Sequence, residues 1–184
     1  MRARWSPRHD GNRGATEGAR DSFHAHLEGS ATRGSPRRTG FDGLPRQRRC
    51  ARAGPRAPTD DRSVRVVLRT AIGRIDLAID VERAPLSGGD FLRYVERGLY
   101  DGGGFYRVVR PDNDSSSVQI AVVQGGVIDP AKQLPPIAHE PTNRTGILHR
   151  DGVISLARSD VGTGTAAAFF ICIGDQPELD FGGR

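Results

Sequence analysis

Four short segments decide the fold of this chain, and they occur in a fixed order: Phe105-Tyr106-Arg107-Val108-Val109, Val122-Val123-Gln124-Gly125-Gly126, Phe169-Phe170-Ile171-Cys172 and Leu179-Asp180. Each places apolar residues beside one polar or aromatic group, which is typical of strands that line a shallow pocket. We therefore expect one Arg and one Gln to lie beside a Phe. Such a pocket suits an apolar ring held next to an amide.

The segment before these strands predicts a hairpin. Residues 64–69 and 74–80 alternate apolar and polar side chains on either side of a turn that contains Gly73. This period of two is the pattern of a half-buried antiparallel pair of strands.

A single helix is expected to follow the hairpin. It should begin at Pro85, because apolar residues then recur at three- and four-residue spacing and Gly98 lies where a helix would end. Further strands are expected at residues 120–124, 153–158 and 168–173. Loops are expected at residues 110–119, 129–145 and 162–165, and Gly102-Gly103-Gly104 is interpreted as a tight turn rather than a phosphate loop. This order predicts a mainly β domain whose antiparallel sheet closes as a barrel.

From about Val64 to the last residue, this succession resembles the cyclophilin family of peptidyl-prolyl cis-trans isomerases. The resemblance implies an eight-stranded antiparallel β-barrel with a helix at each open end. Beyond Leu179-Asp180 the family pattern would continue with the closing strands and the second helix, and the sequence stops at Arg184. We therefore expect an incomplete cyclophilin-like domain with open sheet edges, low stability and little or no activity of its own.

The resemblance also implies roles for individual residues. The catalytic guanidinium falls on Arg107, the amide that holds the substrate backbone on Gln124, and pocket residues on Phe170 and Leu179. Val122 and Ala157 are expected to contribute to the same substrate-binding pocket.

The chemistry of this set suits rotation about an X-Pro bond. Donation of the nitrogen lone pair holds that bond planar, and a permanently charged guanidinium at Arg107 would withdraw the lone pair as the bond twists. This stabilises the twisted state more than the planar one, and it needs neither a nucleophile nor a metal. No cofactor is expected.

Several positions depart from the better-known members of the family. Tyr106 stands where they have His, Ala168 where they have Gln, and Glu178 where they have a Trp associated with cyclosporin binding. Residues 110–119 form a longer loop, as in a divergent bacterial subgroup. The pocket is therefore expected to be smaller and less polar, and sensitivity to cyclosporin is not predicted.

The N-terminal third differs in composition from the rest. Residues 1–60 contain thirteen Arg, no Lys and six acidic residues, whereas the whole chain of 184 residues has a net charge of +5. We interpret residues 1–62 as a disordered arm and residues 63–184 as the folded domain, because the arm has too little apolar surface to offset its ordering entropy. The arm is interpreted as a solvated tail or as translated sequence upstream of the natural start, and binding of nucleic acid through it stays open as an alternative.

Other features restrict the class of protein. The chain has no secretory signal and no apolar stretch of membrane-spanning length, which predicts a cytoplasmic monomer; a periplasmic or secreted protein is the alternative if the start is misassigned. Cys50 and Cys172 are expected to be free thiols, and His24 and His26 have no ligand partners at metal-binding spacing.

Two hypotheses of function therefore stand. The first is an isomerase that acts on X-Pro bonds of proline-containing polypeptides during folding. The second is a module that binds proline-containing peptides without turnover, or an inactive fragment, with a basic arm able to bind nucleic acid. Replacing Arg107 by Ala separates the two, because only the first needs the guanidinium.

Overall fold

A computed structural model describes residues 2–7, 22–28, 63–158, 160 and 162–183. The elements in this part of the chain are β1 (Arg2–Pro7), β2 (Ser22–Leu27), β3 (Val64–Thr70), β4 (Gly73–Ile79), α1 (Pro85–Glu96), β5 (Gly103–Val109), β6 (Val122–Gly126), the 3-10 turn η1 (Pro130–Lys132), β7 (Ile137–Ala138), α2 (Thr142–Thr145), β8 (Ile154–Ala157), β9 (Thr163–Cys172) and the 3-10 turn η2 (Pro177–Leu179). The mainly β prediction is thus confirmed.

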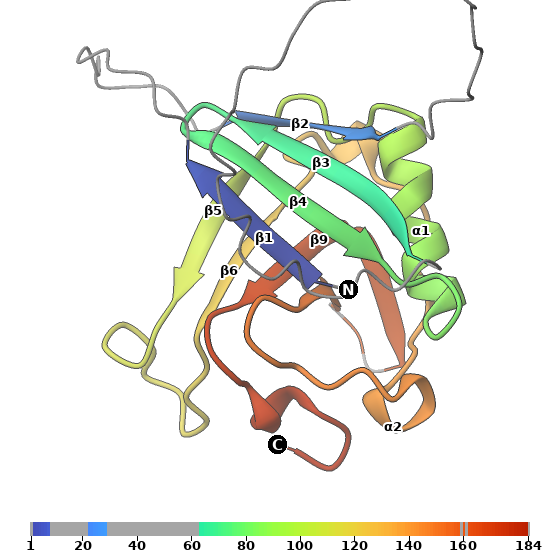
Figure 1. Ribbon diagram of the computed structural model, residues 1–184. Coiled ribbons are helices and arrows are strands. Elements are labelled where there is room, and N and C mark those ends of the chain that lie inside the picture. The colour runs from blue at the N-terminus through green and yellow to red at the C-terminus, as the bar shows by residue number, and fades with distance from the viewer. Residues whose placement is uncertain (1, 8–21, 29–62, 159, 161, 184) are drawn as a thin grey trace, which may run out of the picture.

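The strands pair in the order β1-β4-β3-β2-β5-β6-β9-β7, and β8 also pairs with β9. All of these pairings are antiparallel. The sheet curls into a half-barrel, with β1 to β4 on one side and β6 and β9 on the other (Figure 1). At the edge of the sheet, the backbone N–H of Ala3 donates to the carbonyl of Gly152 at 2.6 Å, which links β1 to the turn before β8.

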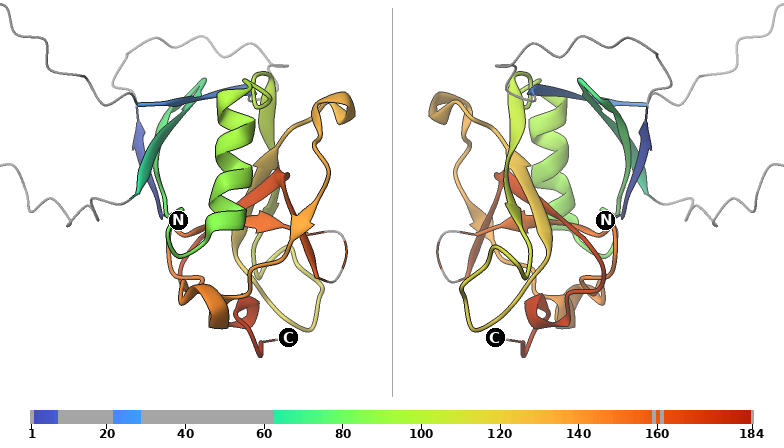
Figure 2. Two further views of the ribbon diagram at one scale, coloured as in Figure 1. Left: turned by 90° about the vertical axis from the view of Figure 1, so that its right-hand side faces the viewer. Right: turned by 90° about the vertical axis from the view of Figure 1, so that its left-hand side faces the viewer.

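The hairpin and the helix predicted from the sequence are confirmed. β3 and β4 pair in register, with Val66 opposite Leu77 and Leu68 opposite Ile75, and these four side chains are buried. The helix α1 begins at Pro85, whose fixed φ suits a first helical position. It runs alongside the sheet (Figure 2), and its buried side chains belong to the hydrophobic core.

The predicted loops hold more regular structure than their composition indicates. β9 begins at Thr163, so most of the predicted 162–165 loop is strand, and the predicted 129–145 loop contains η1, β7 and α2. Thr163 and Gly164 pair with β7, and this pairing extends β9 beyond its apolar run. Tertiary pairing overrides local composition here.

Two stretches of the predicted disordered arm are strands, so the prediction is wrong for them. β1 pairs along its length with β4, and β2 pairs with β3 on one side and with β5 on the other. Disorder was inferred from average composition, which does not register that Phe23, Ala25 and Leu27 alternate with the two histidines at strand period. The remaining residues of the 1–62 segment lie outside the described residues, and binding of nucleic acid through it stays a prediction.

These two strands also change the expectation of open edges. β2 occupies the place between β3 and β5, and β1 covers the outer edge of β4. Both edges of β3 and of β4, and the edge of β5 that faces β3, are therefore paired.

A cluster of aromatic rings fills the interior of the half-barrel. We call it the aromatic core; its members are Phe23, Phe91, Tyr94, Tyr100, Phe105 and Phe169. Neighbouring rings lie 5.2 to 6.1 Å apart between centroids and are mostly tilted or edge-to-face, the arrangements that aromatic quadrupoles favour. The rings come from β2, α1, β5, β9 and the segment after α1, so the core ties together elements that are far apart in sequence.

Polar groups inside the core are paired. The hydroxyl of Tyr100 donates to the carbonyl of Ala166 at 2.7 Å, and burial raises the pKa of Tyr100 well above its ordinary value. The buried carboxylate of Asp90 accepts from the backbone N–H of Ala166 at 2.9 Å and from the guanidinium of Arg93. These bonds fix α1 against the start of the β9 segment that carries the site.

Candidate active site

One row of side chains crosses four strands. Arg107 on β5 lies directly opposite Gln124 on β6, Gln124 lies opposite Phe170 on β9, and Phe170 lies opposite Ser155 on β8. Directly opposed residues of antiparallel strands project to the same face of the sheet. The sheet register therefore sets a guanidinium, a carboxamide, a phenyl ring and a hydroxyl side by side.

A β-bulge on β5 makes this row possible. Phe105 pairs with Gly125 and Arg107 pairs with Gln124, so the strand carries one extra residue, Tyr106, against β6. Without the extra residue, Arg107 would lie opposite Val123 instead of Gln124. A bulge thus re-aims the guanidinium toward the carboxamide.

Two glycines of β6 allow the close packing around the row. Gly126 has φ of +151°, and a Cβ added there would lie 2.1 Å from the carbonyl oxygen of Ala167. At Gly125 an added Cβ would lie 2.8 Å from the ring of Phe105. The Gly-Gly pair quoted from the sequence is therefore required by the approach of β6 to its neighbours.

The row lines a large pocket with a volume of about 600 Å³. We call it the large pocket. Every site residue predicted from the sequence contributes to its wall: Arg107, Val122, Gln124, Ala157, Phe170 and Leu179. The structure thus brings all six together, although they come from β5, β6, β8, β9 and η2.

The charge of Arg107 is directed at an amide rather than at a carboxylate. Its Nη1 donates to the side-chain oxygen of Gln124 at 3.1 Å, and the side chain of Arg107 is exposed. The pKa of Asp114 is lowered chiefly by hydrogen bonds from Ser116 and to a smaller extent by the charge of Arg107. Because the amide of Gln124 is neutral, this hydrogen bond does not offset the positive charge that Arg107 presents to a bound ligand.

A histidine missed by the sequence analysis belongs to the same wall. The side chain of His149 is only 11% exposed and lines the large pocket. It is hydrogen-bonded to Asp180 and stacked on Phe170. It lies in an irregular segment, where no periodicity marks a residue as inward-facing, so the sequence carried no signal for it.

A second histidine, His139, lies at the rim of the pocket. Partial burial lowers the pKa of His139, and the positive charge of Arg158 acts in the same direction. Its imidazole is therefore neutral at physiological pH.

Two residues beyond Phe170 on β9, Cys172 pairs with Val122 of β6 and is buried. Cys172 is a free thiol, as the sequence predicts, and burial raises its pKa to about 12. A thiol in this state is not a nucleophile at neutral pH. Cys50 lies outside the described residues.

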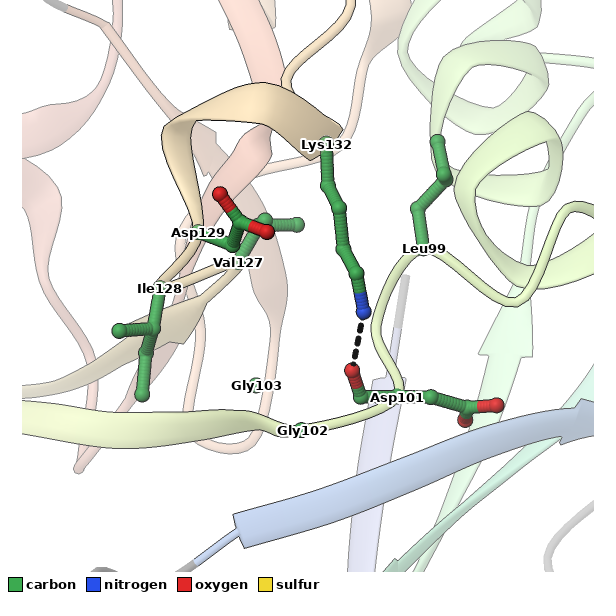
Figure 3. A pocket seen from close by; sticks show the side chains of 8 residues that line it. All are labelled: Leu99, Asp101, Gly102, Gly103, Val127, Ile128, Asp129 and Lys132. Atoms are coloured by element: carbon green, nitrogen blue, oxygen red, sulfur yellow. Dashed lines mark hydrogen bonds between the residues drawn. The ribbon is translucent and has the colours of Figure 1, made fainter.

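A smaller hollow, with a volume of about 210 Å³, lies between residues 99–103 and residues 127–132 (Figure 3). The ammonium group of Lys132 reaches across it and donates to the backbone carbonyl of Asp101 at 2.7 Å. None of the six predicted site residues lines this hollow. We therefore place the candidate active site in the large pocket.

Two further features of the described residues bear on its class. They contain no cluster of three or more His, Cys, Asp or Glu side chains placed to hold a metal ion, and His24 instead contacts the carboxylate of Asp101 at 3.0 Å. Within the same part of the chain, no helix has the length and apolar character needed to cross a bilayer.

The structure is a curled antiparallel sheet with one long helix, and a guanidinium, a carboxamide and a phenyl ring line one pocket of this β-barrel-type domain. The family model described as "Cyclophilin type peptidyl-prolyl cis-trans isomerase/CLD" matches residues 65–183. The chain belongs to this family, as the resemblance implied.

Curated bacterial proteins are similar to the chain. Peptidyl-prolyl cis-trans isomerase A of Dickeya dadantii is 35% identical over 125 residues, which cover 66% of this chain and 60% of the relative. Peptidyl-prolyl cis-trans isomerase cyp18 of Streptomyces antibioticus is 33% identical over 62% of this chain and 65% of the relative. Peptidyl-prolyl cis-trans isomerase B of Escherichia coli is 28% identical, with 65% and 68% covered. The chain thus spans about three fifths of the length of the first two relatives.

Proposed function

We propose that this chain catalyses cis-trans isomerisation of X-Pro peptide bonds in proline-containing polypeptides, and that the large pocket is its active site. The row Arg107–Gln124–Phe170 carries the proposal, because it sets the three groups that this rotation needs on one face of the sheet. Membership of the isomerase family supports it independently.

Each group in the row has a distinct task. The half-buried ring of Phe170 and the apolar side chains of Val122 and Leu179 hold the pyrrolidine ring. Gln124 holds a polar group of the substrate backbone, so that one side of the peptide bond stays fixed while the other turns.

Arg107 acts on the bond itself. The planar X-Pro amide is separated from its twisted form by a barrier of about 20 kcal/mol, because planarity delocalises the nitrogen lone pair. In the twisted form that lone pair is localised and accepts a hydrogen bond from a guanidinium N–H. Since the planar form offers no such acceptor, the interaction lowers the barrier selectively. No covalent bond forms or breaks.

The test is the replacement Arg107→Ala. We expect kcat/KM for a short peptide with one X-Pro bond to fall about 100- to 1,000-fold, the usual effect of removing a donor that acts on the transition state. The melting temperature should change little, because Arg107 is exposed and in the described residues bonds a neutral partner. NMR exchange spectroscopy measures the isomerisation rate without a coupling enzyme.

Arg74→Ala is the matched control. Arg74 is also an exposed arginine on a strand, paired with Asp76 at 3.3 Å and absent from the large pocket, so its loss should leave the rate unchanged. If the unmodified chain shows no isomerisation, or if Arg107→Ala retains more than a third of the rate, the proposal is wrong. Retention of peptide binding without any isomerisation in the unmodified chain would instead support a binding module.

A further inference from the structure

The row of side chains in the candidate site ends at Ser155 on β8. His149 contacts both this serine and the ring of Phe170. His149 lies between α2 and β8, six residues before Ser155, and both side chains line the large pocket. Its imidazole is almost parallel to the ring of Phe170, with 19° between the planes and 5.8 Å between the centroids. Offset stacking of this kind is a favoured aromatic geometry. One face of Phe170 is therefore held by His149.

The imidazole of His149 is itself fixed at both nitrogens. Its Nδ1 lies 2.9 Å from Oδ1 of Asp180, and its Nε2 lies 3.2 Å from Oγ of Ser155. A carboxylate accepts only, so Nδ1 carries the proton in the neutral ring and Nε2 accepts from the hydroxyl of Ser155. The ring can neither flip nor slide without losing one of these bonds.

The backbone joins the same network. The N–H of His149 donates to Oδ1 of Asp180 at 2.9 Å, so one carboxylate oxygen receives both the backbone and the ring of the histidine. Asp180 directly follows Leu179, another residue of the pocket wall. The next residue, Phe181, donates its backbone N–H to Oγ1 of Thr142 in α2 at 2.8 Å. The two residues after η2 are thus bonded to His149 and to α2.

His149 therefore links two parts of the wall that belong to separate elements. Phe170 lies on β9 and is half-buried, and Leu179 ends η2 and is half-buried. Both side chains are apolar, so neither can fix its distance from the other by a hydrogen bond of its own. The stack on Phe170 and the bond to Asp180 supply that constraint through one imidazole.

We propose that His149 is a positioning residue of the isomerase site, which fixes the phenyl ring of Phe170 relative to Leu179 and so sets the width of the slot for the proline ring. This inference rests on the proposed function. The proline ring occupies the slot in both the planar and the twisted state, so a loosened slot weakens both equally. Uniform loss of binding raises KM and leaves kcat unchanged.

The experiment replaces His149 by Ala and measures kcat and KM separately with the X-Pro peptide. We expect KM to rise about three- to tenfold, the range that corresponds to one aromatic stack, with kcat within twofold of the unmodified protein. A role confined to folding would give the opposite pattern, because a smaller folded fraction lowers apparent kcat and leaves KM unchanged. His149→Phe keeps the stack and loses both hydrogen bonds, so its KM should lie between those of the unmodified protein and of His149→Ala.

His24→Ala is the matched control. His24 also pairs its Nδ1 with an Asp carboxylate, at 3.0 Å from Asp101, but its side chain is 64% exposed and does not line the large pocket. Its loss should change neither KM nor kcat. His149→Phe retains an aromatic ring of similar size and serves as the test variant if His149→Ala does not fold.

A readout without turnover separates this inference from the proposed function. In protein labelled at phenylalanine, the ring signals of Phe170, assigned by their loss in Phe170→Leu, should shift in His149→Ala and stay in place in His24→Ala. If the unmodified protein shows no isomerisation, the proposed function fails and these signals still decide whether His149 holds the ring. Unchanged Phe170 signals, or an unchanged KM in an active protein, would overturn the inference.

Discussion

Phe169 and Phe170 are adjacent on β9 and lie in opposite environments. Phe169 is fully buried and contacts the rings of Phe23, Phe91 and Tyr100 in the aromatic core. Phe170 is half-buried, lines the large pocket and stacks on His149. Because successive side chains of a strand point to opposite faces, β9 forms a wall with the core on one side and the candidate site on the other.

The two faces of β9 are held by different forces. On the core face, apolar burial and ring packing are dominant, and the polar groups of Tyr100 and Asp90 are paired internally. On the pocket face, the half-buried ring of Phe170 stacks on His149, which is itself held by hydrogen bonds to polar side chains. Stability should therefore depend mainly on the core face, and activity on the pocket face.

The largest expected effect comes from exchanging each phenylalanine for alanine. Phe169→Ala should lower the free energy of unfolding by about 3 to 5 kcal/mol, because it leaves a cavity among rings that cannot close over it. Phe170→Ala removes a half-exposed ring and should cost less than half as much, while kcat/KM for an X-Pro peptide falls. Urea denaturation measures both free energies, and equal losses of stability would contradict the separation of the two faces.

A smaller loss is expected at β2, which tests whether the core face extends into the N-terminal strands. Phe23 is fully buried against Tyr100, Phe105 and Phe169, so Phe23→Ala should cost about 3 kcal/mol. The neighbouring variant His24→Ala lies on the exposed face and should cost less than about 0.5 kcal/mol. If Phe23→Ala has no effect on urea denaturation, β2 does not contribute to the core.

The smallest effect is expected at the junction of β4 and α1, outside both faces. Asp80 accepts from the backbone N–H of Arg83 at 2.9 Å and from its guanidinium at 2.5 Å. Burial raises the pKa of Asp80, but these bonds outweigh it, so the pKa lies below its ordinary value of 3.8. Asp80→Asn should therefore cost about 1 kcal/mol at neutral pH.

The lowered pKa of Asp80 also predicts how its contribution to stability changes with pH. Because the unfolded chain binds the proton of Asp80 more readily, the stabilisation is present above pH 3.8 and is lost as the pH falls through the lower folded pKa. The difference between Asp80→Asn and the unmodified protein should shrink over that range in acid denaturation curves. A difference that stays constant down to the acid transition would refute the role of the carboxylate.

Much of the fold and the site could be predicted from the sequence because the signals are periodic and local. The alternation in residues 64–69 and 74–80 predicts β3 and β4, and Pro85 and Gly98 bracket α1. The six site residues were predicted by resemblance to a family, and they line one pocket in the structure. Their individual roles stay predictions until the variants are measured.

What the sequence did not reveal depends on distant pairing. β2 is a strand because it fits between β3 and β5, and nothing in the composition of the Arg-rich segment indicates that place. His149 lies in irregular chain, so its burial depends on Asp180 and Phe170, which follow it by about twenty and thirty residues. The alternation in β2 indicates a strand, but neither the partners of that strand nor the burial of His149 leaves a periodic trace.

The position of β2 has a consequence for biosynthesis. Its partners β3 and β5 both follow it in the chain, and β5 is made only after β4 and α1 are complete. During translation β2 therefore cannot complete its pairing until β5 has been made, whereas strands adjacent in sequence, such as β3 and β4, can already pair. Docking of this strand against β5 should be a late step of maturation, and it brings Phe23 into the aromatic core.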